Sequence, residues 1–437
     1  RNVQRFLAAA LASSHRYAAV LRHQKEAPRA LALFEASDYL TEILIRHPEE
    51  IATLSETEEA GPRPGPGYLF DRSLMEPCEP SSVKPAWLER PMAPSDPTFA
   101  YLADSPVPYG EKLALLRRHF RHRAFAVGAR DVIESRDVYE SFGGITLAAA
   151  DAMAAAFSMA GAPQGLAVMA LGRLGSGEFD LLSDADVLFV REEEGDGIAL
   201  TRCAEQMMHA LSAYTREGMV FPVDARLRPW GGEGDLLSTP TQLTAYFEHE
   251  AQPWEALMYT KLRSFAGSKA LGERASAQLK NLFERFAADA GFAEAVCEMR
   301  TKLEAAELEK SFKSSPGGTY DIDFITSFLL VKHGVASKQG SLRDRLWRCA
   351  SAGRLDKSDA AALDHAAELL RTAEHVSRLV VGRPGKWLPA TEHGRQVTEK
   401  LAGKILNREF PDGLENELAR TLGTVRTIYD KVLRGRG

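Results

Sequence analysis

The chain has 437 residues, too many for one ordinary hydrophobic core, so about two or three domains are expected. Hydrophobic residues make up 45% of the chain and charged residues 26%, a balance typical of folded globular proteins and not of disordered ones. The net charge of −6 argues against a polyanionic partner such as long nucleic acid.

Cysteine usage and hydropathy point to a cytoplasmic protein. Cys78, Cys203, Cys297 and Cys349 lie far apart without a CxxC pair, which disfavours a disulfide framework or a zinc site and is typical of reduced thiols. No apolar stretch reaches the roughly 20 residues that a membrane span needs, and the start does not resemble a signal peptide, so no membrane partner is expected. The first residue is Arg1 and not Met, which suggests a piece of a longer protein.

The first part of the chain is predicted to be helical. Apolar residues recur at helical spacing through residues 2–58, and "EASDYLTEILIRHPEE" offers Ser37 or Asp38 as a helix cap, with Pro48 to end that helix. Residues 61–97 hold so many Pro and Gly that no regular element should persist, which predicts a linker or a long irregular loop. Helical patterning resumes near Pro108 and runs to about residue 160.

Between about residues 165 and 270 the pattern changes to strands. "GLAVMAL", "ADVLFV" and "MVFPVDARLRP" are apolar runs, and "EQMMHALSAYT" lies between the last two as a helix. Helical patterns then continue to the end of the chain. We therefore predict an α+β fold, predominantly α: a helical N-terminal region (1–135), a domain built on a mixed sheet (136–290) and a C-terminal helical bundle (291–437).

Two aspartates stand in the second predicted strand, where ionised carboxylates are expensive to bury without a cation. Asp184 and Asp186 are two residues apart, so a strand points both carboxylates to the same face, where they repel each other. A divalent cation relieves that repulsion, and Mg²⁺ commonly combines one or two carboxylates with substrate phosphates. The pair therefore predicts a site for a metal–nucleotide complex.

Two neighbouring features fit that prediction. Gly175 and Ser176 precede the pair in a Gly-rich turn, where backbone N–H groups can approach a phosphate. Asp224 lies in the third predicted strand with Arg226 and Arg228 on the same face, which indicates an ion cluster bordering a phosphate site. A purely structural Asp–Arg bridge is the alternative interpretation of Asp224.

The order of Gly-Ser, Asp-x-Asp and a distant third acid resembles the nucleotidyltransferase superfamily. Ordered motifs narrow the resemblance to the glutamine synthetase adenylyltransferase family, also called glutamate–ammonia ligase adenylyltransferase. These motifs fall within residues 37–334 and read "SDYLTEILIRHPEE", "ALGRLGSGEFDLLSDADVLFV", "VDARLRPWGGEGDLLSTPTQLTAYFEHEAQPWEALMYTKLRSFAG" and "SSPGGTYDIDFITSFLLVKHG".

The resemblance implies a nucleotidyltransferase-type sheet domain and two-metal adenylyl transfer from ATP to a tyrosine of glutamine synthetase, which regulates nitrogen assimilation. Asp184 and Asp186 would hold Mg²⁺ on the triphosphate of ATP, and Asp224 would complete a metal site and help deprotonate the tyrosine. The reaction would be in-line displacement at the α-phosphorus with release of pyrophosphate. The PII signal protein and glutamine are implied as effectors.

The resemblance assigns nucleotide contacts to further residues. Gly175 and Ser176 would cradle phosphate, Arg226 and Arg228 would bind phosphates, and Lys261 would contact the nucleotide. For Trp254, Glu255, Lys261 and Arg263 a structural role is at least an equal alternative, with Trp254 packing and Glu255 pairing with a basic residue. For Asp321 and Asp323, in "PGGTYDIDF", a helix-opening role is favoured over catalysis.

Departures from the family pattern leave alternatives open. Arg173 and Ser176 replace a usual Lys and Gly, which keeps charge and small size. Full-length members resemble two catalytic halves in tandem, one attaching AMP and one removing it by phosphorolysis to give ADP, and this chain resembles one half. Attachment is favoured over removal. A uridylyltransferase that modifies PII and a non-catalytic docking module are the other hypotheses.

Overall fold

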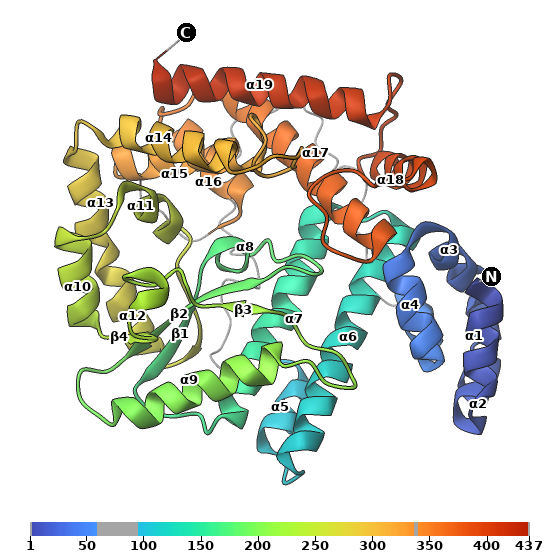
Figure 1. Ribbon diagram of the computed structural model, residues 1–437. Helices are drawn as coiled ribbons and strands as arrows, with labels where there is room; N and C mark the ends of the chain where they lie inside the picture. The colour runs from blue at the N-terminus through green and yellow to red at the C-terminus, as the bar shows by residue number, and fades with distance from the viewer. Residues whose placement is uncertain (1, 59–94, 336–339, 436–437) are drawn as a thin grey trace.

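The computed structural model describes residues 2–58, 95–335 and 340–435. The predicted Pro/Gly-rich segment 61–97 lies outside the described residues, except for its last three positions, and so does Cys78. The fold is α+β and predominantly α, as predicted, with helices surrounding one small sheet (Figure 1).

Helices form the first part of the chain. They are α1 (Asn2–Leu11), α2 (Ser14–Arg22), η1 (Gln24–Glu26), α3 (Ala27–Ala36), α4 (Asp38–Arg46), η2 (Pro48–Glu58), α5 (Pro97–Asp104), α6 (Tyr109–Glu134) and α7 (Val138–Met159). Ser37 caps α4 as predicted, because its Oγ accepts a hydrogen bond from the backbone N–H of Leu40 at 3.1 Å. The same hydroxyl donates to the carbonyl of Leu379 at 2.6 Å, which ties the start of α4 to a helix near the other end of the chain.

The sheet follows. Its elements are β1 (Leu166–Ala170), α8 (Gly172–Gly175), β2 (Ala185–Arg191), α9 (Gly197–Ser212), β3 (Val223–Asp224), η6 (Gly231–Glu233), β4 (Leu237–Ser238), α10 (Pro240–His249), α11 (Pro253–Tyr259) and β5 (Arg263–Gly267). The strand order is β3-β2-β1-β5, with β4 also paired to β2; β1 is antiparallel to β2 and β5, whereas β3 and β4 are parallel to β2. The third predicted strand is only two residues long, since Pro222 before it has no N–H for a ladder.

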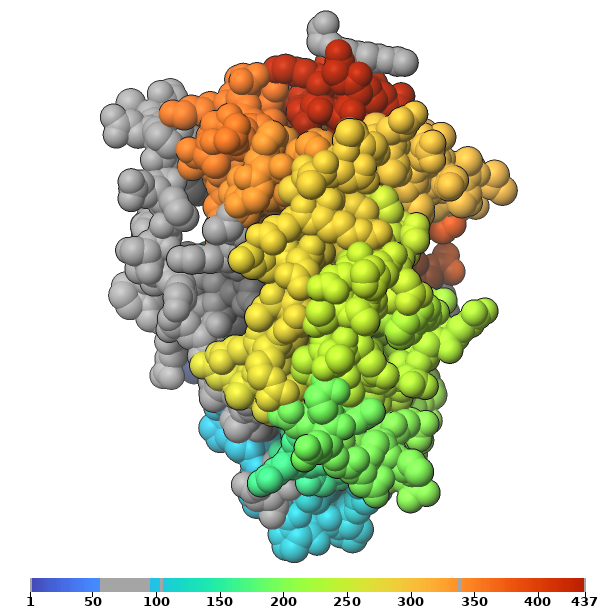
Figure 2. Space-filling view, turned by 90° about the vertical axis from the view of Figure 1, so that its left-hand side faces the viewer, coloured from blue at the N-terminus to red at the C-terminus, as the bar shows by residue number. Residues whose placement is uncertain are grey.

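The remaining chain is helical. Its helices are α12 (Lys269–Ala277), α13 (Leu279–Ala288), α14 (Phe292–Ala305), α15 (Thr319–Lys332), α16 (Leu342–Ser351), α17 (Lys357–Val381), α18 (Glu392–Ile405) and α19 (Leu414–Arg434). Helices α14 to α19 gather on one side of the sheet, and α17 reaches across to contact α4 and α7 (Figure 1). Figure 2 looks onto the side of the protein that carries α10 and α13. In this view these helices lie between the sheet region and the C-terminal helices.

Alternate residues of the central strands belong to two hydrophobic clusters. In β2, Val187 and Phe189 pack with the N-terminal helices, whereas Leu188 and Val190 pack with α10 to α19. Both faces of the sheet are thus covered, which explains why β1 and β2 read as continuous apolar runs. Asp186 has the parity of Leu188 and Val190, so its side chain projects toward the C-terminal helices.

One expectation about hydropathy is wrong. Helix α7 is long and apolar enough to cross a membrane by length and composition, although no such stretch was expected. In the structure 72% of its apolar window is buried, and it packs against α5, α6, α9 and β5. Its composition therefore reflects burial on nearly all sides within the protein core.

Candidate active site

Three predicted acids come together at one end of the sheet. Asp186 in β2 and Asp224 in β3 are paired positions of a parallel ladder, and Asp184 comes directly before β2. The Ala185 N–H donates to the Pro222 carbonyl at 2.8 Å, which joins the two strands where the acids lie. Strand pairing, and not sequence proximity, brings Asp224 to the first two residues.

A glycine creates the space that Asp186 occupies. Gly172 has φ +54°, in the left-handed region, and a Cβ at this position would overlap the Asp186 carboxylate. The Leu171 N–H donates to the Asp186 carbonyl at 2.9 Å, so the turn of α8 lies directly against β2. Sequence reasoning missed Gly172, and the Gly-rich turn was its only signal.

The negative charges of the three acids disfavour one another, and a bound cation would relieve this repulsion. Burial raises the pKa of Asp186 to about 6, helped by the Asp224 and Asp184 carboxylates. No three His, Cys, Asp or Glu side chains of the described residues already form a metal-ligand group. The carboxylate oxygens of these acids are ligands that Mg²⁺ prefers. Asp184 and Asp186 line a cavity, whereas Asp224 is hydrogen-bonded to Arg226.

Asp224 is held by its neighbour. The Arg226 guanidinium donates from Nε to both carboxylate oxygens at 3.0 and 2.9 Å, and these hydrogen bonds lower the pKa of Asp224. Arg226 is 79% exposed, so little packing keeps it there. Arg228 instead donates to the carbonyls of Ala225, Gly232 and Gly234, and thereby fixes the loop after β3.

The Gly-Ser pair divides between two environments. A Cβ on Gly175 would overlap the Lys261 carbonyl and crowd that of Ala170, so this glycine permits close packing of the backbone. Ser176 lines the cavity, and its hydroxyl donates to the Arg173 carbonyl at 3.1 Å.

A cavity of about 540 Å³ lies beside the acids, between α8, β2 and the C-terminal helices. Of the predicted site residues, those that line it are Asp184, Asp186, Ser176 and Lys261, whereas Asp224, Gly175, Arg226 and Arg228 are outside its described lining. Lys261 is ion-paired with Asp323, which also accepts from Arg345 at 2.9 Å. Burial alone would raise the pKa of Asp323, but these two cations lower it to about 2.

The remaining motif residues separate into lining and packing roles. Trp254 lines the cavity. Glu255 is buried and accepts from the Tyr246 hydroxyl at 2.8 Å, so it pairs with a phenol and not with the base expected in its packing role. Asp321 is fully buried, where it accepts from Arg300 and from the Gly317 N–H, and it therefore anchors the start of α15. Asp323, two residues on, faces the cavity instead.

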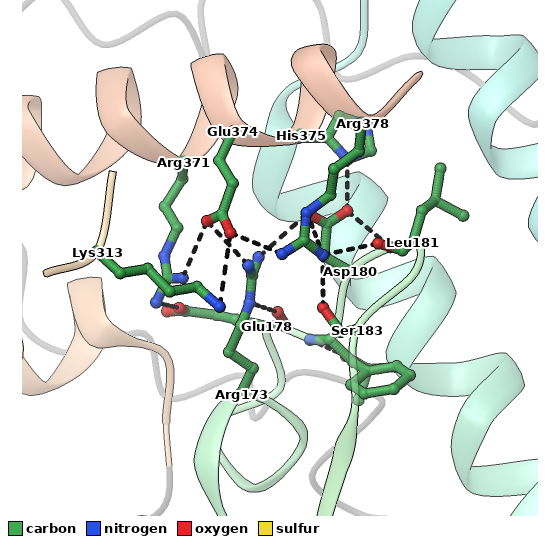
Figure 3. Close-up of polar contacts among 12 residues, drawn as sticks. Arg173, Glu178, Asp180, Leu181, Ser183, Lys313, Arg371, Glu374, His375 and Arg378 are labelled. Carbon is green, nitrogen blue, oxygen red and sulfur yellow. Dashed lines mark hydrogen bonds and ion pairs between the residues drawn. The ribbon is translucent and has the colours of Figure 1, made fainter. Parts of the chain in front are cut away.

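A buried charge network forms one wall of the cavity, and sequence reasoning missed it (Figure 3). Glu374 of α17 accepts from Arg378 at 2.7 Å and from Arg173 at 3.1 Å. Burial alone would raise the pKa of Glu374, but Lys313, Arg173 and Arg378 hold it well below its usual value. Arg371 adds an ion pair with Glu178 at 3.0 Å. The network thus joins the turn of α8 to α17.

His375 locks this network to the N-terminal helices. Its two ring nitrogens lie 2.6 Å from Asp180 and 3.0 Å from Asp131 of α6, and all three side chains are buried. Burial alone would lower the pKa of His375, but the two carboxylates raise it to about 10. The imidazolium is therefore a fixed positive charge that links α17 and α6.

Comparisons with known proteins match two regions of this chain. Residues 97–278 match a family model described as glutamate-ammonia ligase adenylyltransferase, and residues 291–433 match one described as GlnD PII-uridylyltransferase. The first match contains the sheet and the three acids, and the second contains Lys313, Asp323 and α17. The cavity therefore lies between the two matched regions.

Similar curated proteins carry the name bifunctional glutamine synthetase adenylyltransferase/adenylyl-removing enzyme. The protein of Streptomyces avermitilis is 30% identical over 424 residues, which covers 92% of this chain and 39% of that protein. Those of Streptomyces coelicolor and Hahella chejuensis are 32% and 31% identical, over 72% and 55% of this chain and 34% and 27% of their own lengths. The chain thus spans well under half the length of these relatives. Its similarity extends over most of its own residues, and the chain belongs to the glutamate–ammonia ligase adenylyltransferase family.

Proposed function

We propose that this chain transfers AMP from ATP to a tyrosine of glutamine synthetase. The observation that carries the proposal is the pairing of Asp186 with Asp224 beside Asp184, at the edge of a cavity with basic walls. Family membership supports the same chemistry, and the names of the relatives include both the attachment and the removal of AMP.

In this proposal Asp184 and Asp186 would hold Mg²⁺, and Asp224 would serve as a third ligand. When bound, the metal neutralises charge on the phosphate tail and on the attacking and leaving oxygens. The tyrosine oxygen forms a bond to the α-phosphorus, the bond to the bridging oxygen of the β-phosphate breaks, and pyrophosphate leaves. Asp224 accepts the phenolic proton or aids its loss.

Arg226 controls when Asp224 is free to act. Its guanidinium now occupies both carboxylate oxygens, so it must turn away before Asp224 meets a metal or a proton. Because the side chain is exposed, that movement disturbs little packing, and the released guanidinium is then close enough to the acids to donate to phosphate oxygens.

Lys261 and Ser176 have positioning roles. Lys261 is held by Asp323 inside the cavity, where burial lowers its pKa while the carboxylate opposes that change. The Ser176 hydroxyl lies on the turn that adjoins Asp186. Both are placed to orient the nucleotide.

The decisive experiment incubates the chain with α-labelled ATP, Mg²⁺ and glutamine synthetase. Label on a tyrosine of glutamine synthetase supports the proposal. In a parallel reaction with PII and α-labelled UTP, label on PII supports the uridylyltransferase alternative, whereas binding without turnover in both reactions supports a docking module. Phosphate-dependent release of ADP from adenylylated glutamine synthetase, without attachment, would replace attachment by removal.

A further inference from the structure

The wall of the cavity that Arg173, Lys313 and α17 form carries an excess of positive charge. Its lining has six basic side chains and three acidic ones. Lys261 and Arg345 are balanced in part by Asp323. The other four basic residues are Arg173, Lys313, Arg371 and Arg378.

These four cations gather around one carboxylate. Figure 3 shows their nitrogens converging on Glu374, which lies between Lys313 on one side and Arg378 on the other. Glu178 and Asp180 also pair with members of the group, but Asp180 is shared with the charged His375. Three carboxylates therefore oppose four cations and part of a fifth.

Several donors of this wall lack a hydrogen bond. Arg371 Nε and Arg378 Nε are buried without a hydrogen-bond partner among the described residues, and Arg173 Nη2 makes only an ion pair with Asp180 at 3.4 Å. Two buried acceptors of the network, Glu178 Oε2 and Asp180 Oδ2, also lack a hydrogen bond, so the donors in excess are those of the arginines. Lys313 Nζ lies 3.6 Å from Glu374, which is longer than a hydrogen bond. Buried donors normally have partners, so this arrangement has unused capacity for an anion with several acceptor oxygens.

The wall lies next to the acids. Arg173 directly follows Gly172, whose Cα packs against the Asp186 carboxylate. Lys313 is the link between the two ends of the cavity: it is ion-paired with Glu374 and also acts to lower the pKa of Asp186. An anion bound here would be adjacent to a phosphorus atom that reacts beside Asp184 and Asp186.

We propose that Arg173, Lys313, Arg371 and Arg378 form a subsite for a phosphate group other than the one transferred. The assignment rests on the proposed function and deepens it. Two sources have the right chemistry: the β- and γ-phosphates of the nucleotide, and a free orthophosphate that attacks in the reverse, AMP-removing direction. The C-terminal helices then complete the active site in place of merely packing against it.

Lys313 offers the cleanest test because its side chain is 36% exposed and makes no short contact with Glu374. Lys313→Gln is compared with Lys310→Gln, whose 66% exposed side chain pairs with Glu415 outside the cavity. Calorimetric titration at constant ionic strength measures binding of ATP, orthophosphate and AMP to each full chain. Circular dichroism checks that both variants are folded.

We expect Lys313→Gln to weaken the binding of ATP, of orthophosphate or of both by about tenfold or more, which is the loss expected for one charge-assisted hydrogen bond. Its affinity for AMP should stay within about twofold of wild type. The Lys310→Gln variant should bind all three ligands within about twofold of wild type. A loss for ATP alone identifies the nucleotide tail, and a loss for orthophosphate alone identifies the free anion. Equal behaviour of the two variants would overturn the subsite. So would an equal loss for AMP, which would put Lys313 at the transferred phosphate.

The two proposals fail separately. If no label reaches glutamine synthetase but Lys313→Gln still binds ATP or orthophosphate more weakly than the wild type, the subsite stands and the proposed reaction does not. If label transfer occurs while Lys313→Gln binds all three ligands as the wild type does, the reaction stands and the subsite does not.

Discussion

Replacing Asp186 by Asn should stabilise the metal-free protein while it abolishes adenylyl transfer. The shift in the pKa of Asp186 from 3.8 to about 6 corresponds to about 3 kcal/mol at 1.36 kcal/mol per unit. Because Asp186 is only half-buried, solvent screening reduces the expected gain to about 1–2 kcal/mol. Asn has nearly the same shape and removes a charge that burial, Asp224 and Asp184 all disfavour.

The raised pKa of Asp186 also predicts how the stability gain of Asp186→Asn depends on pH. A carboxyl whose pKa is raised by folding imposes no penalty below pH 3.8, where both states are protonated, and the full penalty above about pH 6. Urea unfolding without divalent ions should thus show the Asp186→Asn advantage growing between pH 4 and pH 6 and constant above it. Millimolar Mg²⁺ should raise the melting temperature of the wild type and not of the variant. A variant no more stable than the wild type at pH 8 would refute the reasoning.

Two further substitutions test the geometry around the acids. Gly172→Ala should destabilise the fold by about 1–3 kcal/mol and reduce turnover, because alanine at φ +54° is strained and its Cβ displaces the Asp186 carboxylate. Urea unfolding measures the loss of stability, and label transfer measures the loss of turnover. Gly110→Ala, where a Cβ meets nothing within 4 Å, is the matched control. Arg226→Ala should raise the apparent KM for ATP about tenfold, because charge-assisted hydrogen bonds to a ligand contribute roughly 1.5–3 kcal/mol. It should leave the urea-unfolding midpoint unchanged, because the side chain is exposed. An unchanged KM would restrict Arg226 to a structural bridge with Asp224.

Local patterns predicted the features that depend on local geometry. The cap at Ser37 requires only residues of one helix turn, and the common face of Asp184 and Asp186 follows from the period of a strand. Asp224 was identifiable because an acid in an apolar run is unusual, although its partnership with Asp186 depends on strand order. Arg228 shows the limit, since the loop whose carbonyls it binds could not be anticipated from spacing.

The charged wall was hidden for a different reason. Arg371, Glu374 and Arg378 recur at helical spacing in "RTAEHVSR", so the sequence does indicate one polar face of α17. Such faces are ordinarily solvated, and periodicity does not tell whether another element covers them. Here the cover is Arg173, 201 residues from Glu374 in the chain. Only the tertiary structure turns a polar stripe into part of a site.

The link between α17 and the N-terminal helices should be the most sensitive point of the fold. His375→Gln leaves the buried carboxylates of Asp131 and Asp180 without their shared cation, which should cost about 3–5 kcal/mol in unfolding free energy at pH 7. Because folding raises the pKa of His375 from 6.5 to about 10, its contribution is fully present below pH 6.5 and is lost as the pH rises through 10. The difference between variant and wild type should therefore narrow from pH 7 to pH 10 in urea unfolding, while the exposed control His249→Gln stays within about 0.5 kcal/mol throughout. A stability difference between variant and wild type that does not change with pH would mean that His375 stabilises the protein by packing and neutral hydrogen bonds. The buried charge network would then not depend on the positive charge of His375.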